Sequence, residues 1–358
     1  MKLASFFSGA GGLDRGFENA GFDVVYANEY DKTIWATYEH NFPHTKLDRR
    51  SIVDIKAEEV SACDGMIGGP PCQSWSEAGS LRGIDDARGQ LFFEYIRILE
   101  AKRPLFFLAE NVSGILFNRH RGAFESILEN FAVLGYNVSY GLLNANDFGV
   151  PQDRERVIIV GYLAQTGKFF QPPEVVEPRP TLEAIRDLAK TAKPAAEKNH
   201  ANTTLKVPNH EYMTGGFSTI FMSRNRVRPY NLPSYTIQAG GRHAPLHPQA
   251  PEMVVVGKDK RAFVEGAEHL YRRLSVRECA RVQTFPDDHL FVYSKVADGY
   301  KMVGNAVPVT FAEHLATKIK SDLKGMSKID RTEVLEGSIV GPDFGLGSYQ
   351  GNLLSQIG

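Results

Sequence analysis

Cysteine is scarce in this chain, and long apolar runs are missing altogether. The 358 residues include three cysteines, Cys63, Cys72 and Cys279, which are too few and too scattered for a disulfide framework or a zinc site. No run of eighteen apolar residues occurs, which excludes a transmembrane helix, and the N-terminal segment lacks the apolar core of a signal peptide. These absences predict a cytoplasmic protein that binds neither a membrane nor a metal ion.

The charge of the chain is nearly balanced, but its distribution is uneven. The formal net charge is −1, whereas residues 200–290 hold 12 Lys and Arg against 8 Asp and Glu. Within 212–251 there are four arginines and no acidic residue. A local excess of positive charge attracts a polyanion whatever the total charge is. A solvated polar loop has the same composition, so the motifs must decide between these interpretations.

Short apolar runs alternate with helical patterns through the first 165 residues. Runs typical of strands occupy 2–7, 23–28, 64–69, 104–110 and 156–162. Apolar residues recur at helical spacing in 13–21, 91–102 and 122–135. Such alternation is typical of parallel strands joined by right-handed crossovers. The sequence therefore predicts an α/β fold with a doubly wound, Rossmann-like sheet.

This alternation ends near residue 175, in a segment rich in proline and acidic residues. Residues 176–291 are rich in Asn, Gly, Pro, Arg and His, and they predict a second, smaller, loop-rich domain. A helical pattern over 309–324 predicts that the chain returns to the first domain, which would comprise 1–175 plus 292–325. The remaining residues, 326–358, have no strong periodicity and are interpreted as a flexible tail.

Three features indicate an adenosine-containing cofactor at the carboxyl ends of the strands. The glycines of FSGAGG (7–12) allow a close approach of backbone to ligand. Glu29 ends the second strand and is placed to accept hydrogen bonds from ribose hydroxyls, and Asp54 is expected at the end of the third strand. The GxGxxG fingerprint is absent, which disfavours a nicotinamide-dependent oxidoreductase. Each feature alone has a purely structural alternative.

Cys72 follows the fourth strand within GGPPCQSWSEAGS (68–80). A lone cysteine is usually a small, packed apolar residue. Here Pro70 and Pro71 stiffen the backbone that precedes the thiol, and small residues follow it. This setting favours a nucleophile presented at the strand end.

Two polar motifs are expected to face this thiol. Glu110 ends the apolar fifth strand, so partial loss of solvent is expected to raise its pKa and let it donate a proton. QDRER (152–156) places Gln152, Arg154 and Arg156 on one face if it is extended. A salt-bridged edge strand is the alternative for that motif.

Together, these residues carry a resemblance to a known family. FSGAGG, PPCQ, ENV, QDRER, RECARVQTFP (277–286) and YKMVGNAVPV (300–309) occur in the order and spacing of the bacterial cytosine-C5 DNA methyltransferases. The resemblance covers residues 2 to about 322. Residues 220–251 and 74–86 closely resemble the type II restriction–modification methylases that recognise GGCC, and the segment after residue 325 matches no pattern of the family.

The resemblance implies a covalent mechanism. The Cys72 thiolate would add to C6 of a cytosine flipped out of the duplex, while Glu110 contacts N3 and the exocyclic amine. C5 would then take a methyl group from S-adenosylmethionine, and the glycines and serines at 74–80 would be a hinge for a closing loop. The catalytic residues implied are Cys72, Glu110, Asn111, Val112, Gln152, Arg154 and Arg156, of which Arg154 and Arg156 would hold the base carbonyl and a phosphate.

The resemblance also implies the binding residues. S-adenosylmethionine, leaving as S-adenosylhomocysteine, would contact Phe7, Ser8, Gly9, Ala10, Gly11, Gly12, Glu29, Asp54, Ile55, Pro70, Leu91, Asn305 and Val307. Residues 176–291 would be the target-recognition domain, with double-stranded DNA contacted by Ser76, Arg224, Arg226, Arg228 and Arg242. Because arginine pairs with guanine through two hydrogen bonds, Arg226 and Arg242 are predicted to read bases, with Arg224 close by.

Two other functions stay open at this point. A eukaryotic branch of the family methylates tRNA, although the arginine-bearing second domain favours duplex DNA. A catalytically inactive DNA-binding regulator is disfavoured by the presence of Cys72, Glu110 and QDRER together. The enzyme is expected to act as a monomer, and a cognate restriction endonuclease would cut the same site without needing to bind the enzyme.

Overall fold

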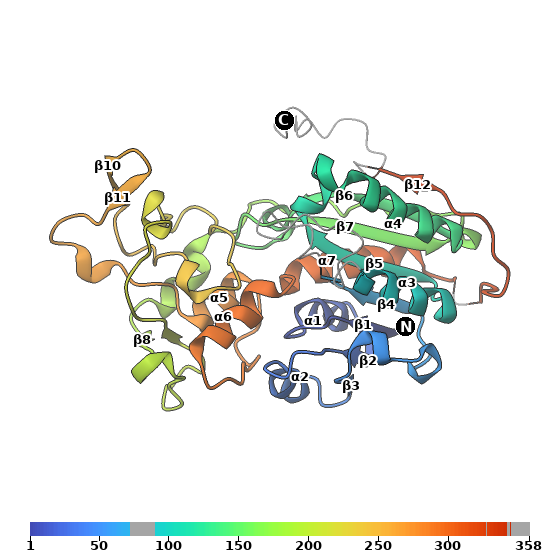
Figure 1. Cartoon of the computed structure of the whole chain (residues 1–358), viewed down its shortest axis with the longest axis horizontal. Coiled ribbons are helices and arrows are strands. Elements are labelled where there is room, and N and C mark those ends of the chain that lie inside the picture. The colour runs from blue at the N-terminus through green and yellow to red at the C-terminus, as the bar shows by residue number, and fades with distance from the viewer. Residues whose placement is uncertain (72–89, 327, 342–343, 345–358) are drawn as a thin grey trace.

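The computed structural model describes residues 1–71, 90–326, 328–341 and 344. A layered α/β part lies to the right in Figure 1, and a part with little regular secondary structure lies to the left. No helix in the described residues is long and apolar enough to cross a membrane. The domain boundaries that the sequence places after residues 175 and 291 stay a prediction.

An eight-stranded sheet forms the centre of the layered part. Its order is β12-β6-β7-β5-β4-β1-β2-β3. The strands are β1 (Lys2–Phe6), β2 (Asp23–Asn28), β3 (Lys46–Asp48), β4 (Gly65–Gly68), β5 (Phe106–Val112), β6 (Tyr136–Asn144), β7 (Glu155–Leu163) and β12 (Ile339–Val340). Strands β1 to β5 pair in parallel, as expected, but β7 is antiparallel to both β5 and β6. The α/β sheet is therefore confirmed, whereas the expectation of parallel strands throughout is wrong for β7.

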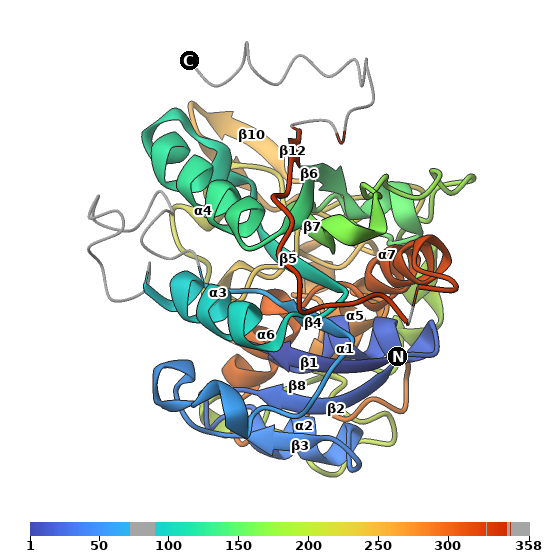
Figure 2. The ribbon, with the colours of Figure 1, turned by 90° about the vertical axis from the view of Figure 1, so that its right-hand side faces the viewer.

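Helices cover both faces of this sheet. Figure 2 shows α3 and α4 on one face and α1 with α7 on the other. The helices are α1 (Gly12–Asn19), α2 (Trp35–Asn41), α3 (Gln90–Lys102), α4 (Arg121–Val133), α5 (Val276–Val282), α6 (Val296–Asn305) and α7 (Val309–Asp322). A Cβ atom on Gly16 of α1 would lie 2.4 Å from the Cβ of Ala312 in α7, so the two helices pack backbone against backbone. The return of the chain to the sheet through α7 agrees with the sequence pattern.

The structure differs from the sequence prediction at two places in the first part. The third strand ends at Asp48, and Asp54 lies six residues further on, in a short 3₁₀ turn (Ile52–Asp54). The apolar character of 51–55 comes from Ile52 and Ile55, which are buried side chains of that turn and its flank rather than of a strand. Strand β6 was not predicted, because its apolar residues are interrupted by Asn, Ser and Gly.

The beginning of the predicted tail is packed against the sheet. Arg331 donates hydrogen bonds to the Cys63 carbonyl and to Asp64, at 3.1 and 2.7 Å. Further along, β12 pairs in parallel with β6, and the Phe344 ring lies against Phe170. The described residues between 328 and 344 therefore form a strap across the sheet, which corrects the expectation of a flexible tail for this stretch.

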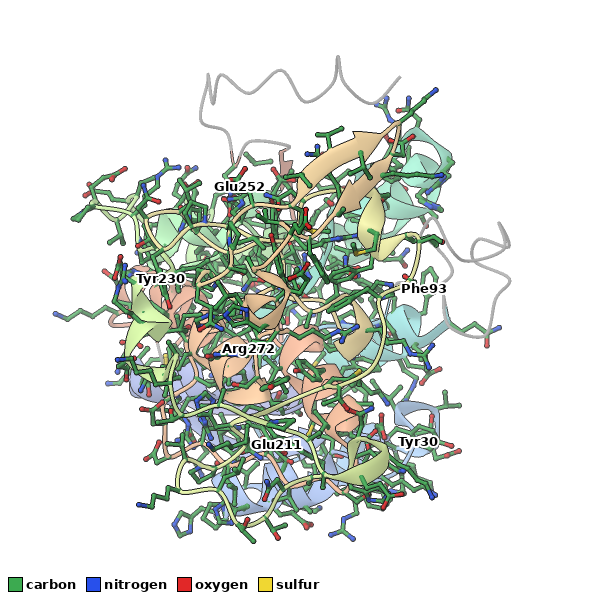
Figure 3. All side chains as sticks on the ribbon, turned by 90° about the vertical axis from the view of Figure 1, so that its left-hand side faces the viewer. Tyr30, Phe93, Glu211, Tyr230, Glu252 and Arg272 are labelled. Carbon is green, nitrogen blue, oxygen red and sulfur yellow. The ribbon has the colours of Figure 1, made fainter. Side chains whose placement is uncertain are left out.

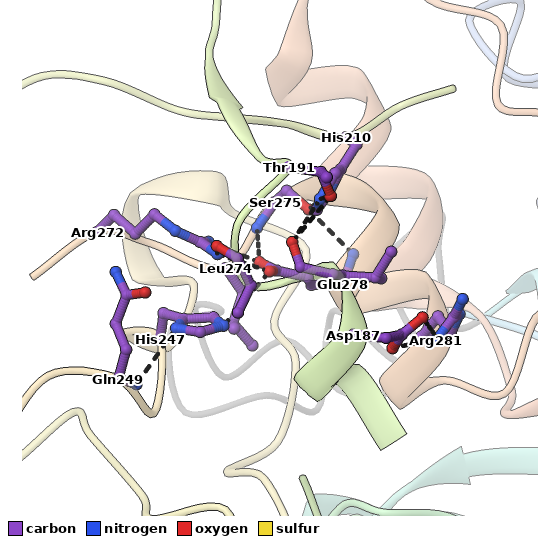
Figure 4. A network of polar contacts seen from close by, with 12 residues as sticks. Asp187, Thr191, His210, His247, Gln249, Arg272, Leu274, Ser275, Glu278 and Arg281 are labelled. Atoms are coloured by element: carbon purple, nitrogen blue, oxygen red, sulfur yellow. Dashed lines mark hydrogen bonds and ion pairs between the residues drawn. The ribbon is translucent and has the colours of Figure 1, made fainter. Parts of the chain in front are cut away.

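The second part is built mainly from loops and short 3₁₀ turns. Its strands are β8 (Lys193–Pro194), β9 (Glu211–Tyr212), β10 (Val254–Gly257) and β11 (Lys260–Ala262). Buried polar side chains connect these loops (Figure 4). Glu278 of α5 is fully buried and accepts two hydrogen bonds from Arg272, both 2.7 Å long. His210 bonds Ser275, the capping residue of α5, at 2.7 Å.

Candidate active site and cofactor site

The topology brings the predicted motifs to one edge of the sheet. Because β1, β2, β4 and β5 run parallel, the segments that follow them meet at their carboxyl ends. β7 runs the other way, so the residues that begin it lie at this same edge. The antiparallel direction that the sequence did not predict is therefore what brings QDRER to ENV.

Glu110 and Arg156 form the ion pair at this edge. Arg156 Nε lies 2.9 Å from Glu110 Oε1, and both side chains are largely buried, with 14% and 12% of their surfaces exposed. Their strands are in register at this place, because Val112 of β5 lies opposite Arg156 of β7. The guanidinium holds the carboxylate in a fixed position without covering it completely.

Asn111 connects this pair to the segment that leads to Cys72. Its amide nitrogen donates to the Pro70 carbonyl at 3.1 Å, and its oxygen accepts from the Val112 amide at 2.9 Å. A Cβ atom on Gly69 would lie 3.3 Å from Glu110 Oε2, so the two strand ends are in close contact. Cys72 and Ser76, together with the predicted hinge at 74–80, lie outside the described residues.

Gln152 and Arg154 are placed differently from Arg156. Both side chains are buried, with 0% and 1% exposed. Arg154 donates to the carbonyls of Ile237, Gly304 and Ala306 at 2.9–3.0 Å, and burial holds the pKa of its guanidinium well below the usual value. A side chain engaged in this way does not fit the expected contact with the base or a phosphate, and its position indicates a structural role.

The FSGAGG loop and Glu29 form a polar cradle next to β1 and β2. Glu29 accepts the Gly9 amide at 2.9 Å and the Asp31 amide at 2.7 Å. Burial raises the pKa of this carboxyl, and the two amide hydrogen bonds oppose that shift. Gly9 has φ +55°, and a Cβ atom there would meet nothing within 4 Å. The backbone at Gly9 is therefore open to a ligand.

The other glycines of the loop serve packing. A Cβ atom on Gly11 would lie 2.1 Å from the Phe42 ring, and one on Gly12 would lie 2.2 Å from the Val307 carbonyl. Val307 lies just beyond α6, so the glycine loop and the returning segment touch, whereas the cofactor site predicted between them stays a prediction. Their contact explains these two glycines without any ligand.

The remaining predicted cofactor residues differ in their exposure to solvent. Asp54 and Asn305 are exposed, Phe7 and Leu91 are half-buried, and Ser8, Ala10, Ile55 and Pro70 are buried. Phe7 has φ +54°, an unusual backbone conformation for a residue with a side chain. The exposed pair has free side-chain surface for a ligand, whereas the side chains of the buried residues have little.

The sequence interpretation missed two aromatic residues beside Glu29. Tyr30, labelled in Figure 3, has 72% of its surface exposed directly after this acid. The Trp35 indole donates to the Glu29 carbonyl at 2.8 Å. The aromatic residue next to Glu29 is visible as EYDKTIW (29–35) in the sequence, but nothing there distinguishes it from a residue of a surface loop.

The basic segment of the second part surrounds a pocket. It is lined by Arg224, Asn225, Arg226, Tyr235, Thr236, Gln238, His243 and Pro245. Arg226 donates to the Phe221 and Ile220 carbonyls at 2.9 and 3.1 Å, and burial lowers its pKa. Arg228 instead pairs with Asp153, whereas Arg224 and Arg242 are exposed.

The two other cysteines are unsuited to nucleophilic chemistry. Burial raises the pKa of Cys63 to about 11, and it raises that of the fully buried Cys279 well above its usual value. Among the residues that the structure describes, no group of three His, Cys, Asp or Glu side chains is placed to hold a metal ion.

Comparison with known proteins agrees with this fold. The chain resembles the crystal structure of a prophage-encoded E. coli protein described as a putative DNA modification methyltransferase, with a TM-score of 0.70, 23% identity, and coverage of 90% of this chain and 99% of that one. It also resembles DNMT2 of Spodoptera frugiperda, with a TM-score of 0.65, 20% identity, and 89% and 99% coverage. The chain therefore has the Rossmann-like α/β fold of these two proteins.

Sequence comparison defines the family. The model of the C-5 cytosine-specific DNA methylases matches residues 1–321. The chain is 56% identical to the type II methyltransferase M.MthTI of Methanothermobacter thermautotrophicus, over 91% of this chain and 99% of that protein. It is 55% identical to M.FnuDI of Fusobacterium nucleatum, over 92% and 97%. The chain belongs to the C-5 cytosine-specific DNA methylase family, and it is an enzyme that methylates DNA.

Proposed function

We propose that this enzyme transfers a methyl group from S-adenosylmethionine to C5 of a cytosine in duplex DNA, within the sequence GGCC. The observation that carries the proposal is the Glu110–Arg156 pair, which lies next to the Gly69–Pro70 segment that leads into Cys72. Attack on a pyrimidine ring requires a thiol and a carboxyl group, and the described segment next to Glu110 continues in sequence into Cys72.

Each residue has a role in this reaction. The Cys72 thiolate forms a bond to C6, and the displaced electron pair is delocalised toward C5, N3 and O2. Glu110 stabilises the ring by its contact with N3, and Arg156 fixes the orientation of Glu110. C5 would then take the methyl group as the bond between the sulfonium sulfur and the methyl carbon breaks and S-adenosylhomocysteine leaves. A base would remove the C5 proton, and the electron pair of that C–H bond would restore the ring double bond as the S–C6 bond breaks and the Cys72 thiolate is released.

The cradle beside β1 and β2 suits S-adenosylmethionine, which supplies an electrophilic methyl group when bound. Glu29 accepts hydrogen bonds from ribose hydroxyls, and the open backbone at Gly9 permits close approach. We add Tyr30 as an aromatic contact to the adenine, because its ring is exposed beside this acid. Asn305 and Val307 form the side of the cradle opposite Glu29.

The pocket with Arg224 and Arg226, together with the nearby Arg242, suits a guanine-rich target. The resemblance of residues 220–251 to GGCC methylases supports GGCC as the DNA target. The named relatives are type II methyltransferases. A cytosine inside a stacked duplex cannot reach the sheet edge, so the base must be flipped out. The enzyme would protect DNA from a cognate endonuclease, acting in the cytoplasm as a monomer.

Trapping with 5-fluorocytosine tests the chemistry. A GGCC duplex carrying this base is incubated with the enzyme and S-adenosylmethionine. Because fluorine at C5 does not leave as a proton does, a covalent protein–DNA adduct should accumulate and resist denaturation. Cys63→Ala is the matched control and should still form the adduct. An adduct that persists in Cys72→Ala would refute the mechanism.

Single-base variants of the site test the reading of sequence. Arg242→Ala should relax discrimination at one base pair by roughly 10–100-fold, because a two-bond contact to guanine is worth about 1–3 kcal/mol. Loss of a phosphate contact would instead weaken methylation of all sequences equally. Unchanged preference in Arg242→Ala would contradict its role as a base reader. An RNA substrate run in parallel separates the tRNA alternative.

A further inference from the structure

Three buried polar side chains meet where the loop-rich part joins the sheet. They are Gln152, Arg154 and Gln283, which we call the polar junction, and at most 1% of each is exposed. Gln152 Nε2 donates to Gln283 Oε1 at 2.7 Å, so the glutamines bind each other directly. Burying three polar groups is unfavourable unless hydrogen bonds satisfy them, so their remaining bonds show what the junction holds.

One side of the junction binds the backbone of Ile237. The Ile237 amide donates to Gln152 Oε1 at 2.7 Å, and its carbonyl accepts from Arg154 Nη1 at 3.0 Å. The residues on either side of Ile237, Thr236 and Gln238, line the pocket that contains Arg224 and Arg226. The junction therefore holds a backbone segment that lines the basic pocket.

The other side binds the end of α6. Gln283 Nε2 donates to the Val303 and Ala306 carbonyls at 2.8 and 3.0 Å. Arg154 Nη2 donates to the Gly304 and Ala306 carbonyls at 2.9 and 3.0 Å. These carbonyls bracket Asn305 and precede Val307, the two residues proposed to close the cofactor cradle.

The two bound segments also touch directly. A Cβ atom on Gly304 would lie 2.3 Å from the Gln238 carbonyl carbon and 2.4 Å from its oxygen. Backbone meets backbone here, so neither segment can move without displacing the other. Arg154 is also two residues from Arg156, which pairs with Glu110. The junction is therefore connected to the proposed cofactor contacts, the basic pocket and the Glu110–Arg156 pair.

We propose that Gln283 is a positioning residue, which couples cofactor binding to DNA reading through the polar junction. This inference rests on the proposed function, since it takes 305–307 as cofactor contacts and 224–243 as DNA contacts. When DNA binds in the pocket, its contacts restrain the Ile237 backbone further. The hydrogen bonds of the junction transmit this restraint to the end of α6. By linkage, the cofactor affects DNA binding by the same factor.

Gln283→Met tests the coupling, because methionine keeps the length of the side chain and removes its hydrogen bonds. The affinity for S-adenosylhomocysteine is measured by calorimetry, with and without a GGCC duplex. In the unaltered enzyme, DNA should tighten this affinity by about 5–150-fold. In Gln283→Met, the factor should fall to within about twofold of one, and discrimination between GGCC and single-base variants should fall with it.

Tyr162→Phe is the matched control. It removes one hydrogen bond, to Asp322, from a buried ring in the sheet, and it touches none of the junction residues. Its coupling factor should equal that of the unaltered enzyme, because general loss of stability does not change a ratio of affinities. If Gln283→Met does not fold, Gln152→Met replaces it. In that variant too, DNA should no longer tighten the affinity for S-adenosylhomocysteine.

The outcomes separate this inference from the proposed function. A coupling factor that is unchanged in Gln283→Met, or in Gln152→Met if that is the variant that folds, overturns the positioning role and leaves methylation untouched. A factor near one in the unaltered enzyme overturns it as well. Failure of the unaltered enzyme to methylate DNA would instead refute the proposed function.

Discussion

The sheet and the loop-rich part are held together by different kinds of contact. In the sheet, strand ladders satisfy the backbone, and apolar side chains from both faces fill the core. In the loop-rich part, few residues are in strands, and buried arginines satisfy the carbonyls instead. Arg277, for example, donates to the carbonyls of Pro208, Pro286 and His289 at 2.9–3.2 Å.

This difference has a consequence for how each part tolerates substitution. A ladder distributes its hydrogen bonds over many residues, whereas one arginine concentrates several of them in a single side chain. Loss of that side chain leaves several buried acceptors unsatisfied at once, each costing about 1–3 kcal/mol. The loop-rich part should therefore depend on single polar residues, and the sheet on the sum of many apolar ones.

Arg277→Met is expected to have the largest effect. Three buried carbonyls and the Asn209 side chain lose their donor, so the free energy of unfolding should fall by about 3 kcal/mol or more. Urea denaturation measures this. Arg121→Met in α4 is the control, since that side chain is 73% exposed and bonds Glu125 on the same helix, and its loss of stability should be far smaller. Equal losses would refute the contrast between the two parts.

Gly304→Ala tests the close contact between the two parts. Its Cβ atom would lie 2.3–2.5 Å from backbone atoms of Gln238 and Ala239, so overpacking should cost about 2–3 kcal/mol. Gly122→Ala in α4 meets nothing within 4 Å and should be stabilising by up to about 1 kcal/mol. Thermal unfolding of both variants checks the opposite signs. Stabilisation by Gly304→Ala would show that the contact is loose.

The two parts should also differ in their response to pH. Burial lowers the pKa of His289 to about 3, so the unfolded chain binds the extra proton between pH 6.5 and 3, and stability falls as the pH falls through that window. Relative to the parent enzyme, His289→Phe should gain about 2 kcal/mol between pH 7 and pH 5. Denaturation at both pH values measures this gain.

Asp14 under the glycine loop should act in the opposite direction. Burial raises its pKa to about 6, so its contribution to stability is present at low pH and is lost as the pH rises through 6. Asp14→Asn should therefore lose about 1 kcal/mol relative to the parent enzyme between pH 7 and pH 5. Parallel pH profiles for His289→Phe and Asp14→Asn would contradict both assignments.

Arg331→Ala is expected to have the smallest effect. It removes the hydrogen bonds from the strap to the Cys63 carbonyl and Asp64, and both charged side chains are about 30% exposed. The loss should be about 1 kcal/mol or less. Lys328→Ala, at an exposed position, should have no measurable effect. A loss above about 3 kcal/mol would mean that the strap is part of the core.

The sequence predicted the sheet better than the loop-rich part, and there is a physical reason. Strands β1, β2, β4 and β5 and helices α1, α3 and α4 have apolar periodicities that are local in sequence. The direction of β7 depends on its antiparallel pairing with β6. The sequence did not indicate this pairing, because polar residues and glycine interrupt the apolar pattern of β6. The roles of Arg154 and Gln152 depend on Ile237 and Ala306, which are more than 80 residues away in the sequence.

Methylation of a GGCC duplex, followed by mass spectrometry of its nucleosides, tests the central claim most directly. We predict 5-methylcytosine from the unaltered enzyme, none above background from Cys72→Ala, and a rate about 100-fold or more lower in Glu110→Gln. N4-methylcytosine or N6-methyladenine as the product, or a full rate in Glu110→Gln, would contradict the proposal that the Cys72 thiol and the Glu110 carboxyl group carry the reaction.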